Sequence, residues 1–178
     1  MEYTEKKIRT INEYRGVILN VQMDWVELPD GSMTLREVAR HPGAVAILPV
    51  DAEGNAYCVR QYRYAVGESV LEIPAGKMEP NEEPILTAAR ELSEETGIVA
   101  KNLVDLGAVY ASPGCFAEVL HLYLGTDLVF EEAHLDEGEM LDVVKIPFDQ
   151  LLEMVMDNAV PDGKTVVAVL KAARILQK

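Results

Sequence analysis

The stretch from Gly76 to Ile98 constrains this chain more than any other part of its sequence. An apolar segment ends at Pro74, and Gly76 permits a sharp turn at little steric cost. A helix is predicted from Pro84 to Thr96, because proline suits the first helical turn and Gly97 suits the position just past the end. We expect the inward stripe of this helix to consist of Ile85, Leu86, Ala89 and Leu92.

Three carboxylates crowd one side of the predicted helix. Glu91 and Glu95 are four residues apart and therefore stack on one face, with Glu94 beside them. Carboxylates placed in this way repel one another, whereas a helix selected for stability more often alternates the signs of its charges. Clustered carboxylate oxygens are the ligands that Mg²⁺ or Mn²⁺ prefers. The segment is therefore either a solvated acidic face or a divalent-metal site.

Charge and cysteine content exclude several classes of partner. The formal net charge of −14 argues against a nucleic-acid backbone or an anionic membrane as partner. A phosphate substrate would need divalent cations to bridge it to the carboxylates. The sequence has no secretory leader and no apolar run long enough to span a bilayer. Cys58 and Cys115 have neither metal-binding nor redox spacing, so a cytoplasmic location is expected.

Two domains are predicted, a small N-terminal β unit over residues 1–42 and a main domain over residues 43–178. In the first, Pro29 to Gly31 forms a tight turn between two strand-like pieces. Its few apolar residues leave a two- or three-stranded sheet marginal alone, so we expect it to pack on the main domain or on a second copy of the chain. Trp25 is interpreted as a partly buried sheet or dimer residue rather than a ligand-stacking one.

The main domain reads as α/β, with helices flanking a mixed sheet. Strands at 44–50 and 56–64 are joined by a hairpin-type connection. Residues 131–139 are acidic and without period, which predicts a flexible loop. Further strands are expected near 103–111, 119–128 and 142–147, and further helices over 148–158 and from 162 to the C-terminus.

The acidic stretch resembles the signature of the Nudix hydrolases at every defined position, which are Gly76, Glu82, Arg90–Leu92, Glu94–Glu95 and Gly97–Ile98. The chain is also similar to the ADP-ribose pyrophosphatase branch of that family. Pro113 follows Gly97 by sixteen residues, and the segments RQYR, LEIPAGKMEP, SPGCFAE and LDEGEMLDV match that branch. The resemblance runs from about Arg15 to the final helix and implies the α/β/α sandwich of the family.

The resemblance implies a role for each matching residue. The implied Mg²⁺ ligands are the Ala75 carbonyl, Glu91, Glu95 and Glu139. The implied catalytic residues are Glu137 as the general base, Glu94 near the metal cluster and Arg90 orienting the carboxylates. The resemblance implies that Arg63 holds the diphosphate and that Gly76 lets the backbone approach the metal and the substrate. It implies that Lys77 lies on the side of the terminal sugar, and that Ser112, Gly114 and Glu118 contact the terminal ribose and neighbouring phosphate. The adenine pocket, shared with a second subunit, would contain Ile18, Arg36 and Glu37.

Two of these assignments leave alternatives. The base could be any acidic residue of the loop, which contains Glu131, Glu132, Asp136, Glu137 and Glu139. Lys77 stands where the family is commonly apolar, and its charge could alter contacts to the terminal sugar. We interpret Glu137 as the base.

The activity that the resemblance implies is hydrolysis of ADP-ribose, a small nucleoside-diphosphate sugar, to AMP and ribose 5-phosphate. It would use two or three Mg²⁺ ions, or Mn²⁺ in their place, and a homodimer that exchanges its N-terminal unit. One alternative is a pyrophosphatase acting on another nucleoside-diphosphate sugar, such as GDP-mannose. The other is a Nudix-fold module that senses ADP-ribose without cleaving it.

Overall fold

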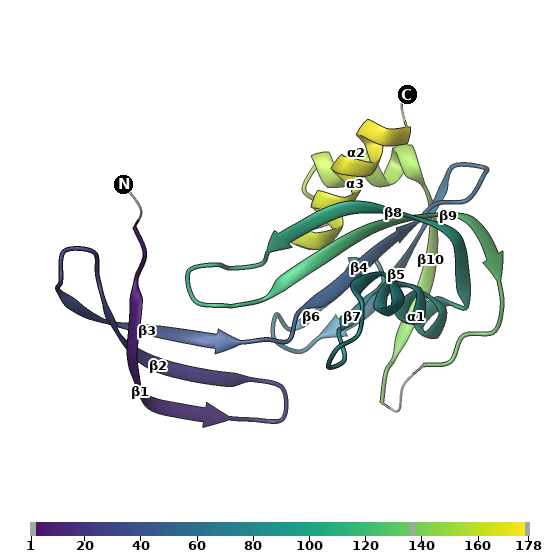
Figure 1. Cartoon of the computed structure of the whole chain (residues 1–178). Coiled ribbons are helices and arrows are strands. Elements are labelled where there is room, and N and C mark those ends of the chain that lie inside the picture. Colours follow the sequence, from purple (N-terminus) through teal and green to yellow (C-terminus); the bar gives the residue numbers. More distant parts are fainter. Residues whose placement is uncertain (1–2, 136–137, 177–178) are drawn as a thin grey trace. The chain divides into compact units, whose positions relative to one another are not determined.

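The chain forms two compact units in a computed structural model that describes residues 3–135 and 138–176. The first unit contains residues 1–43 and 110–119, and the second contains residues 44–109 and 120–178. Their strands and helices are drawn in Figure 1. The segment 110–119 lies outside the N-terminal unit that the sequence predicts.

The first unit is a three-stranded antiparallel sheet with one added segment. Its strands are β1 (Lys6–Arg15), β2 (Asn20–Glu27) and β3 (Met33–Arg40), in that order. The turn expected between β2 and β3 is present, closed by the backbone N–H of Leu28 donating to the Ser32 carbonyl at 2.8 Å. Ala39 of β3 exchanges backbone hydrogen bonds with Cys115 and Ala117, which adds the segment 110–119 to this sheet.

The second unit contains two sheets. One has the order β7-β4-β9-β8 and the other has the order β10-β5-β6. Because β4 runs parallel to β9 and antiparallel to β7, the larger sheet is mixed, as predicted. The strand bounds are β4 (Ala44–Pro49), β5 (Asn55–Arg63), β6 (Glu68–Glu72), β7 (Ala75–Lys77), β8 (Ile98–Tyr110), β9 (Val119–Phe130) and β10 (Leu141–Pro147).

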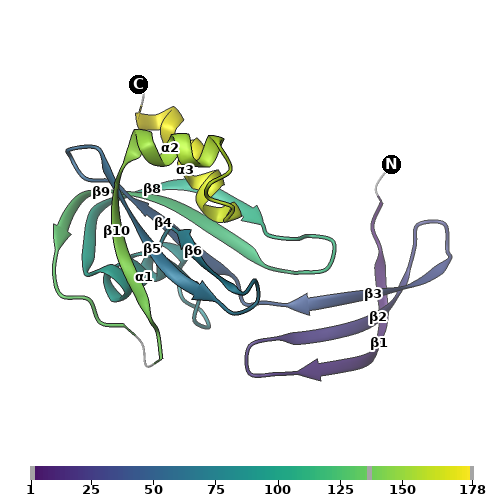
Figure 2. The same ribbon diagram turned by 180° about the vertical axis from the view of Figure 1, so that it is seen from behind.

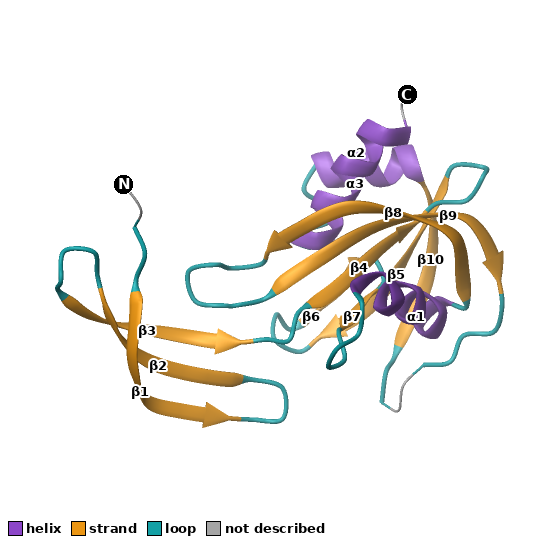
Figure 3. Ribbon diagram, in the orientation of Figure 1, coloured by secondary structure: helices purple, strands orange, loops and turns teal. Residues whose placement is uncertain are grey.

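Alternate residues of β4 face two different cores, because successive side chains of a strand point to opposite faces. Val45 and Ile47 pack in a cluster with helix α1 (Pro84–Thr96). Ala46 and Leu48 pack in a larger cluster with α2 (Phe148–Met156) and α3 (Gly163–Leu176). Figures 2 and 3 show α1 on one side of the strands and α2 with α3 on the other. The expected α/β/α sandwich is confirmed.

The predicted hairpin between residues 44–50 and 56–64 is only partly correct. The connection is tight, since the Asp51 N–H donates to the Asn55 carbonyl at 2.9 Å and Val50 forms an isolated antiparallel β-bridge with Ala56. The two strands then diverge into different sheets, with β4 pairing with β9 and β5 pairing with β10. Local sequence indicates the turn, but the partners that a strand finds farther along the chain decide its sheet.

Helix α1 has the predicted bounds but a different buried face. Gly97 ends it in the left-handed conformation at φ 67°. The expected inward stripe is wrong except at Leu92, because Ile85, Leu86 and Ala89 are exposed. The buried residues are Thr87, Ala88, Leu92 and Glu95. The helix packs on β4 and β7, and its inward face combines Leu92 with two small residues and one carboxylate.

Over the described residues, no helix is long and apolar enough to cross a membrane.

Candidate active site

Glu91 and Glu95 project from α1 toward the strands and form the centre of the site. Glu95 is 4% exposed, and the backbone N–H of Ala75 donates to its Oε2 at 3.2 Å. Burial raises the pKa of Glu95 to about 8, and the charges of Glu91 and Glu139 act in the same direction. Burial also raises the pKa of Glu91, against the effect of Arg90. Three acidic residues are therefore close enough to repel one another.

Gly76 makes room for one of these carboxylates. The prediction of a sharp turn at Gly76 is wrong, because this residue lies in β7 opposite Val45 of β4. A Cβ atom at this position would lie 1.9 Å from Cδ of Glu91. The requirement for glycine is therefore steric: only a residue without a side chain lets the Glu91 carboxylate lie against the strand.

Arg90 binds the carboxylates around it. Its Nε and Nη2 donate to the two oxygens of Glu82 at 3.1 Å each. Its Nη1 lies 2.8 Å from Oε1 of Glu91 and 2.8 Å from Oε2 of Glu94. Hydrogen bonding by Arg90 holds the pKa of Glu82 down to about 2. Arg90 also reaches the carbonyl of Lys77 at 3.4 Å, so it ties the start of the site loop to the helix.

The acidic loop begins against the C-terminal end of α1. The backbone N–H of Glu131 donates to the Gly97 carbonyl at 2.7 Å, and that of His134 donates to the Glu94 carbonyl at 3.0 Å. These bonds leave no space for a side chain at position 97, since a Cβ there would lie 2.4 Å from the Glu131 carbonyl oxygen. The first residues of the loop, expected to be flexible, are therefore held by backbone hydrogen bonds.

The loop supplies one of the predicted ligands to the cluster. Glu139 is half-buried, and its charge acts on both Glu91 and Glu95. The predicted base, Glu137, lies outside the described residues, as does Asp136.

Arg63 stands at the end of β5, close enough to the cluster for its charge to act on Glu95. Its Nε donates to Oε1 of Glu72 at 2.6 Å. That bond, followed by the charges of Glu72 and Glu95, raises the pKa of Arg63 despite the opposing effect of burial. In the part of the chain that the structure describes, neither terminal nitrogen of Arg63 makes a hydrogen bond. Both remain available to a bound anion.

Lys77 is exposed at the end of β7, and the remaining predicted contacts belong to the first unit. Arg36 forms a two-pronged ion pair with Glu5, from Nε to Oε2 at 2.9 Å and from Nη2 to Oε1 at 2.7 Å. An adenine ring stacked on Arg36 would therefore lie against a guanidinium that is already paired with Glu5. Ile18 and Glu37 are exposed.

Glu118 and the Ser-Pro-Gly turn complete the predicted set. Oε1 of Glu118 lies 3.6 Å from Nδ1 of His41, whose ring packs on Phe116. The Ser112 carbonyl accepts hydrogen bonds from the backbone of residues 115 and 116, while Gly114 is exposed. Glu118 is the residue directly before β9 and is half-buried.

The donor set around α1 fits a divalent cation. Buried carboxylates are unfavourable without a positive partner, and within the described residues Glu95 accepts one hydrogen bond, from the Ala75 N–H. Carboxylate and carbonyl oxygens are also the donors that Mg²⁺ accepts. Among residues 3–135 and 138–176, no three His, Cys, Asp or Glu side chains already surround one point. Arg90 and the Ala75 N–H hold these carboxylates in place.

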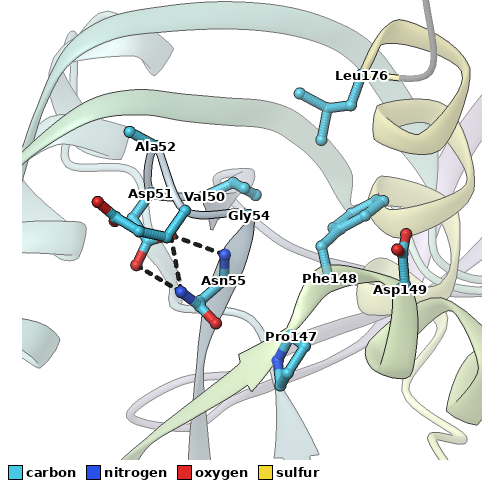
Figure 4. Close-up of a pocket in the computed structure, with 10 residues that line it drawn as sticks. Val50, Asp51, Ala52, Gly54, Asn55, Pro147, Phe148, Asp149 and Leu176 are labelled. Atoms are coloured by element: carbon cyan, nitrogen blue, oxygen red, sulfur yellow. Dashed lines mark hydrogen bonds between the residues drawn. The ribbon is translucent and has the colours of Figure 1, made fainter.

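A surface pocket of about 450 Å³ lies elsewhere in the second unit, between the β4–β5 turn and the start of α2 (Figure 4). It contains none of the predicted site residues. Its acidic lining, Asp51, Glu53 and Asp149, is unsuited to a diphosphate. Asp51 is moreover occupied by hydrogen bonds from Asn55.

Two residues near the cluster escaped the sequence analysis. Glu72 is 1% exposed and binds both Arg63 and Lys164. A charged residue inside the apolar run VLEIP was a signal that could have identified it. Lys164 offered no such signal, because it is ninety-two residues away from Glu72 in the chain.

Comparison with known proteins identifies relatives of this chain. The family model of the NUDIX domain matches residues 39–169. An ADP-ribose pyrophosphatase of Bacillus subtilis (strain 168) is 41% identical over 180 residues, which cover 98% of this chain and 97% of that protein. A methanol dehydrogenase activator of Bacillus methanolicus is 41% identical over 169 residues, covering 94% and 91%. The crystal structure of an ADP compounds hydrolase superposes with a TM-score of 0.81 at 23% identity, covering 97% and 95%, and supports the fold.

Proposed function

The chain belongs to the Nudix family, and from that premise we propose that it hydrolyses the diphosphate of ADP-ribose to AMP and ribose 5-phosphate. The observation that carries the proposal is the pair of Glu91, which is half-buried, and Glu95, which is buried, on one face of α1, with the charge of Glu139 acting on both. The similarity to a named ADP-ribose pyrophosphatase over nearly the whole chain supports the choice of substrate.

Glu91, Glu95, Glu139 and the Ala75 carbonyl would hold two or three Mg²⁺ ions, or Mn²⁺ in their place. Bound there, the cations would neutralise the diphosphate and polarise its P–O bonds. Gly76 lets the Glu91 carboxylate and the substrate approach the strand.

Substrate positioning and proton transfer fall to other side chains. Arg63 binds the diphosphate through its terminal nitrogens. A water oxygen attacks one phosphorus, its proton passes to Glu137, and the bond from that phosphorus to the bridging oxygen breaks. Arg90 orients Glu91 and Glu94. We assign the sugar and its phosphate to Lys77, Ser112, Gly114 and Glu118, and the adenine to Ile18, Arg36 and Glu37.

The relative named as a methanol dehydrogenase activator is as similar to this chain as the pyrophosphatase is. A relative's name therefore does not choose the function. The carboxylates favour hydrolysis, because binding alone does not need one buried and two half-buried acidic groups that repel one another.

The test is product analysis with ADP-ribose, GDP-mannose and diadenosine polyphosphates, each with Mg²⁺ and with EDTA. We expect AMP and ribose 5-phosphate from ADP-ribose, formed fastest of the set and only with metal. Glu95→Gln should abolish the reaction, whereas Glu153→Gln, the same change at an exposed position of α2, should not.

The other outcomes separate the alternatives. Faster cleavage of GDP-mannose would keep the metal site but assign another nucleoside-diphosphate sugar. Binding of ADP-ribose without cleavage of any compound would identify a sensing module and refute the mechanism.

A further inference from the structure

A buried carboxylate lies behind the arginine that we assign to the diphosphate. Glu72, the last residue of β6, is 1% exposed. Its Oε1 accepts a hydrogen bond from Nε of Arg63 at 2.6 Å, and its Oε2 accepts one from Nζ of Lys164. A carboxylate this deeply buried is unfavourable unless it is paired, and here each oxygen has its own cation.

Lys164 is held firmly at the start of α3. Its Nζ lies 3.0 Å from Oδ1 of Asp162, whose Oδ2 accepts from the N–H of Thr165 at 3.0 Å and from its hydroxyl at 2.6 Å. The Thr165 hydroxyl oxygen in turn accepts from the N–H of Ile73 at 2.9 Å. The first turn of α3 is therefore bonded to the residue that follows Glu72, which fixes Lys164 relative to that carboxylate.

Arg63 pairs with Glu72 differently from an arginine on a free carboxylate. A free carboxylate accepts an arginine side-on, through two parallel hydrogen bonds from Nε and one terminal nitrogen. Here Lys164 is bonded to Oε2, and Arg63 bonds Oε1 through Nε alone. Its side chain is 42% exposed, and both terminal nitrogens are without a hydrogen bond within the described residues.

We propose that Lys164 is a positioning residue that occupies one oxygen of Glu72 and so leaves both terminal nitrogens of Arg63 for the substrate diphosphate. The inference rests on the proposed function, because it requires a diphosphate beside the carboxylate cluster. Without the lysine, Glu72 takes Arg63 side-on and withdraws one nitrogen from the substrate.

Steady-state kinetics with ADP-ribose and Mg²⁺ test this assignment. Lys164→Met should raise KM on the order of tenfold and change kcat by less than about twofold, since the diphosphate contact is made in both ground and transition states. Lys164→Arg should restore most of the affinity, because it keeps a cation on Glu72. Lys171→Met is the matched control on the same helix. Lys171 donates to the Leu106 carbonyl and does not contact Glu72, so its loss should leave KM unchanged.

A double-mutant cycle separates positioning from a structural effect. Arg63→Ala should raise KM, and adding Lys164→Met to it should cause no further rise. Additive effects of the two substitutions would overturn the inference, as would an unchanged KM in Lys164→Met. Thermal unfolding identifies a variant that does not fold, in which case Lys164→Gln replaces Lys164→Met with the same expected direction.

Failure of the proposed function looks different. A wild-type protein that cleaves no nucleoside-diphosphate sugar refutes the proposed function before any variant is compared. An active wild type with additive variants refutes only the role of Lys164.

Discussion

At the scale of single residues, Gly76 offers the most direct test of the site. Gly76→Ala should fold, because its backbone does not need a left-handed conformation, but the new Cβ would overlap the Glu91 carboxylate at 1.9 Å. We expect a fall of about 10- to 100-fold in Mg²⁺ affinity or activity, as when other groups that orient metal ligands are lost. Isothermal titration with Mg²⁺ measures it. Gly163→Ala, where no atom lies within 4 Å of the added Cβ, is the control. Equal affinities would show that Glu91 moves aside at no cost.

Glu95 carries a prediction about pH in the metal-free protein. Its pKa is about 8 when folded and near 4.5 when unfolded, so the folded state binds the proton more tightly. Stability must therefore fall as pH rises through that window. In EDTA, thermal unfolding of Glu95→Gln should match wild type near pH 5 and exceed it near pH 9. At pH 9, Mg²⁺ should raise the thermal unfolding midpoint of the wild type more than that of Glu95→Gln. A difference between the wild-type and Glu95→Gln unfolding midpoints that stays the same at every pH would contradict the burial of this carboxylate.

At the scale of elements, the tight turn between β4 and β5 is stabilised by Asp51. Burial opposes its ionisation, but hydrogen bonds from Asn55, Lys145 and Tyr57 hold the pKa of Asp51 well below its usual range. Asp51→Asn should lower the free energy of unfolding at pH 7 by about 1–3 kcal/mol. Since the folded pKa is depressed, the difference from wild type should be complete above about pH 4 and shrink as pH falls below 3.8.

Urea unfolding at pH 7 and pH 3 measures this difference. Glu53→Gln, at an exposed position of the same turn, should be neutral at both pH values. A constant difference between wild type and Asp51→Asn would mean that the contribution comes from the shape of the turn and not from the charge.

At the scale of the whole molecule, the first unit exposes many apolar side chains for so small a sheet. They include Ile8, Ile11, Tyr14, Ile18, Leu19 and Leu35, and every residue of β1 is exposed. We expect a homodimer at micromolar concentration that covers this surface by exchange of the N-terminal unit. Light scattering after size exclusion measures the mass of the species.

Two substitutions test which surface forms the dimer. Ile8→Glu with Ile11→Glu should give a monomer, whereas Met156→Glu, at an exposed site of α2, should not. A monomeric wild type would rule out an adenine pocket shared between subunits.

The same scales show why some predictions succeeded. The bounds of α1 follow from local chemistry, because Pro84 and Gly97 act on the backbone beside them. The buried face of α1 does not follow from local chemistry, since the neighbours of Thr87 and Ala88 come from β4 and β7. The turn at residues 51–55 was likewise predictable, whereas the separation of β4 and β5 into two sheets depends on pairing with β9 and β10.

By itself, the sequence determined the family and the carboxylates of α1, because these depend on residue types at fixed spacing along the chain. It also indicated an α/β architecture with a mixed sheet, through the order of its apolar segments. Only the tertiary structure decided which atoms surround the carboxylates. It placed Gly76 in a strand against Glu91, joined the acidic loop to the end of α1, and brought Lys164 to Glu72 across ninety-two residues. The physical reason is that contacts between distant segments are selected by packing and by the pairing of buried charges, neither of which leaves a local pattern.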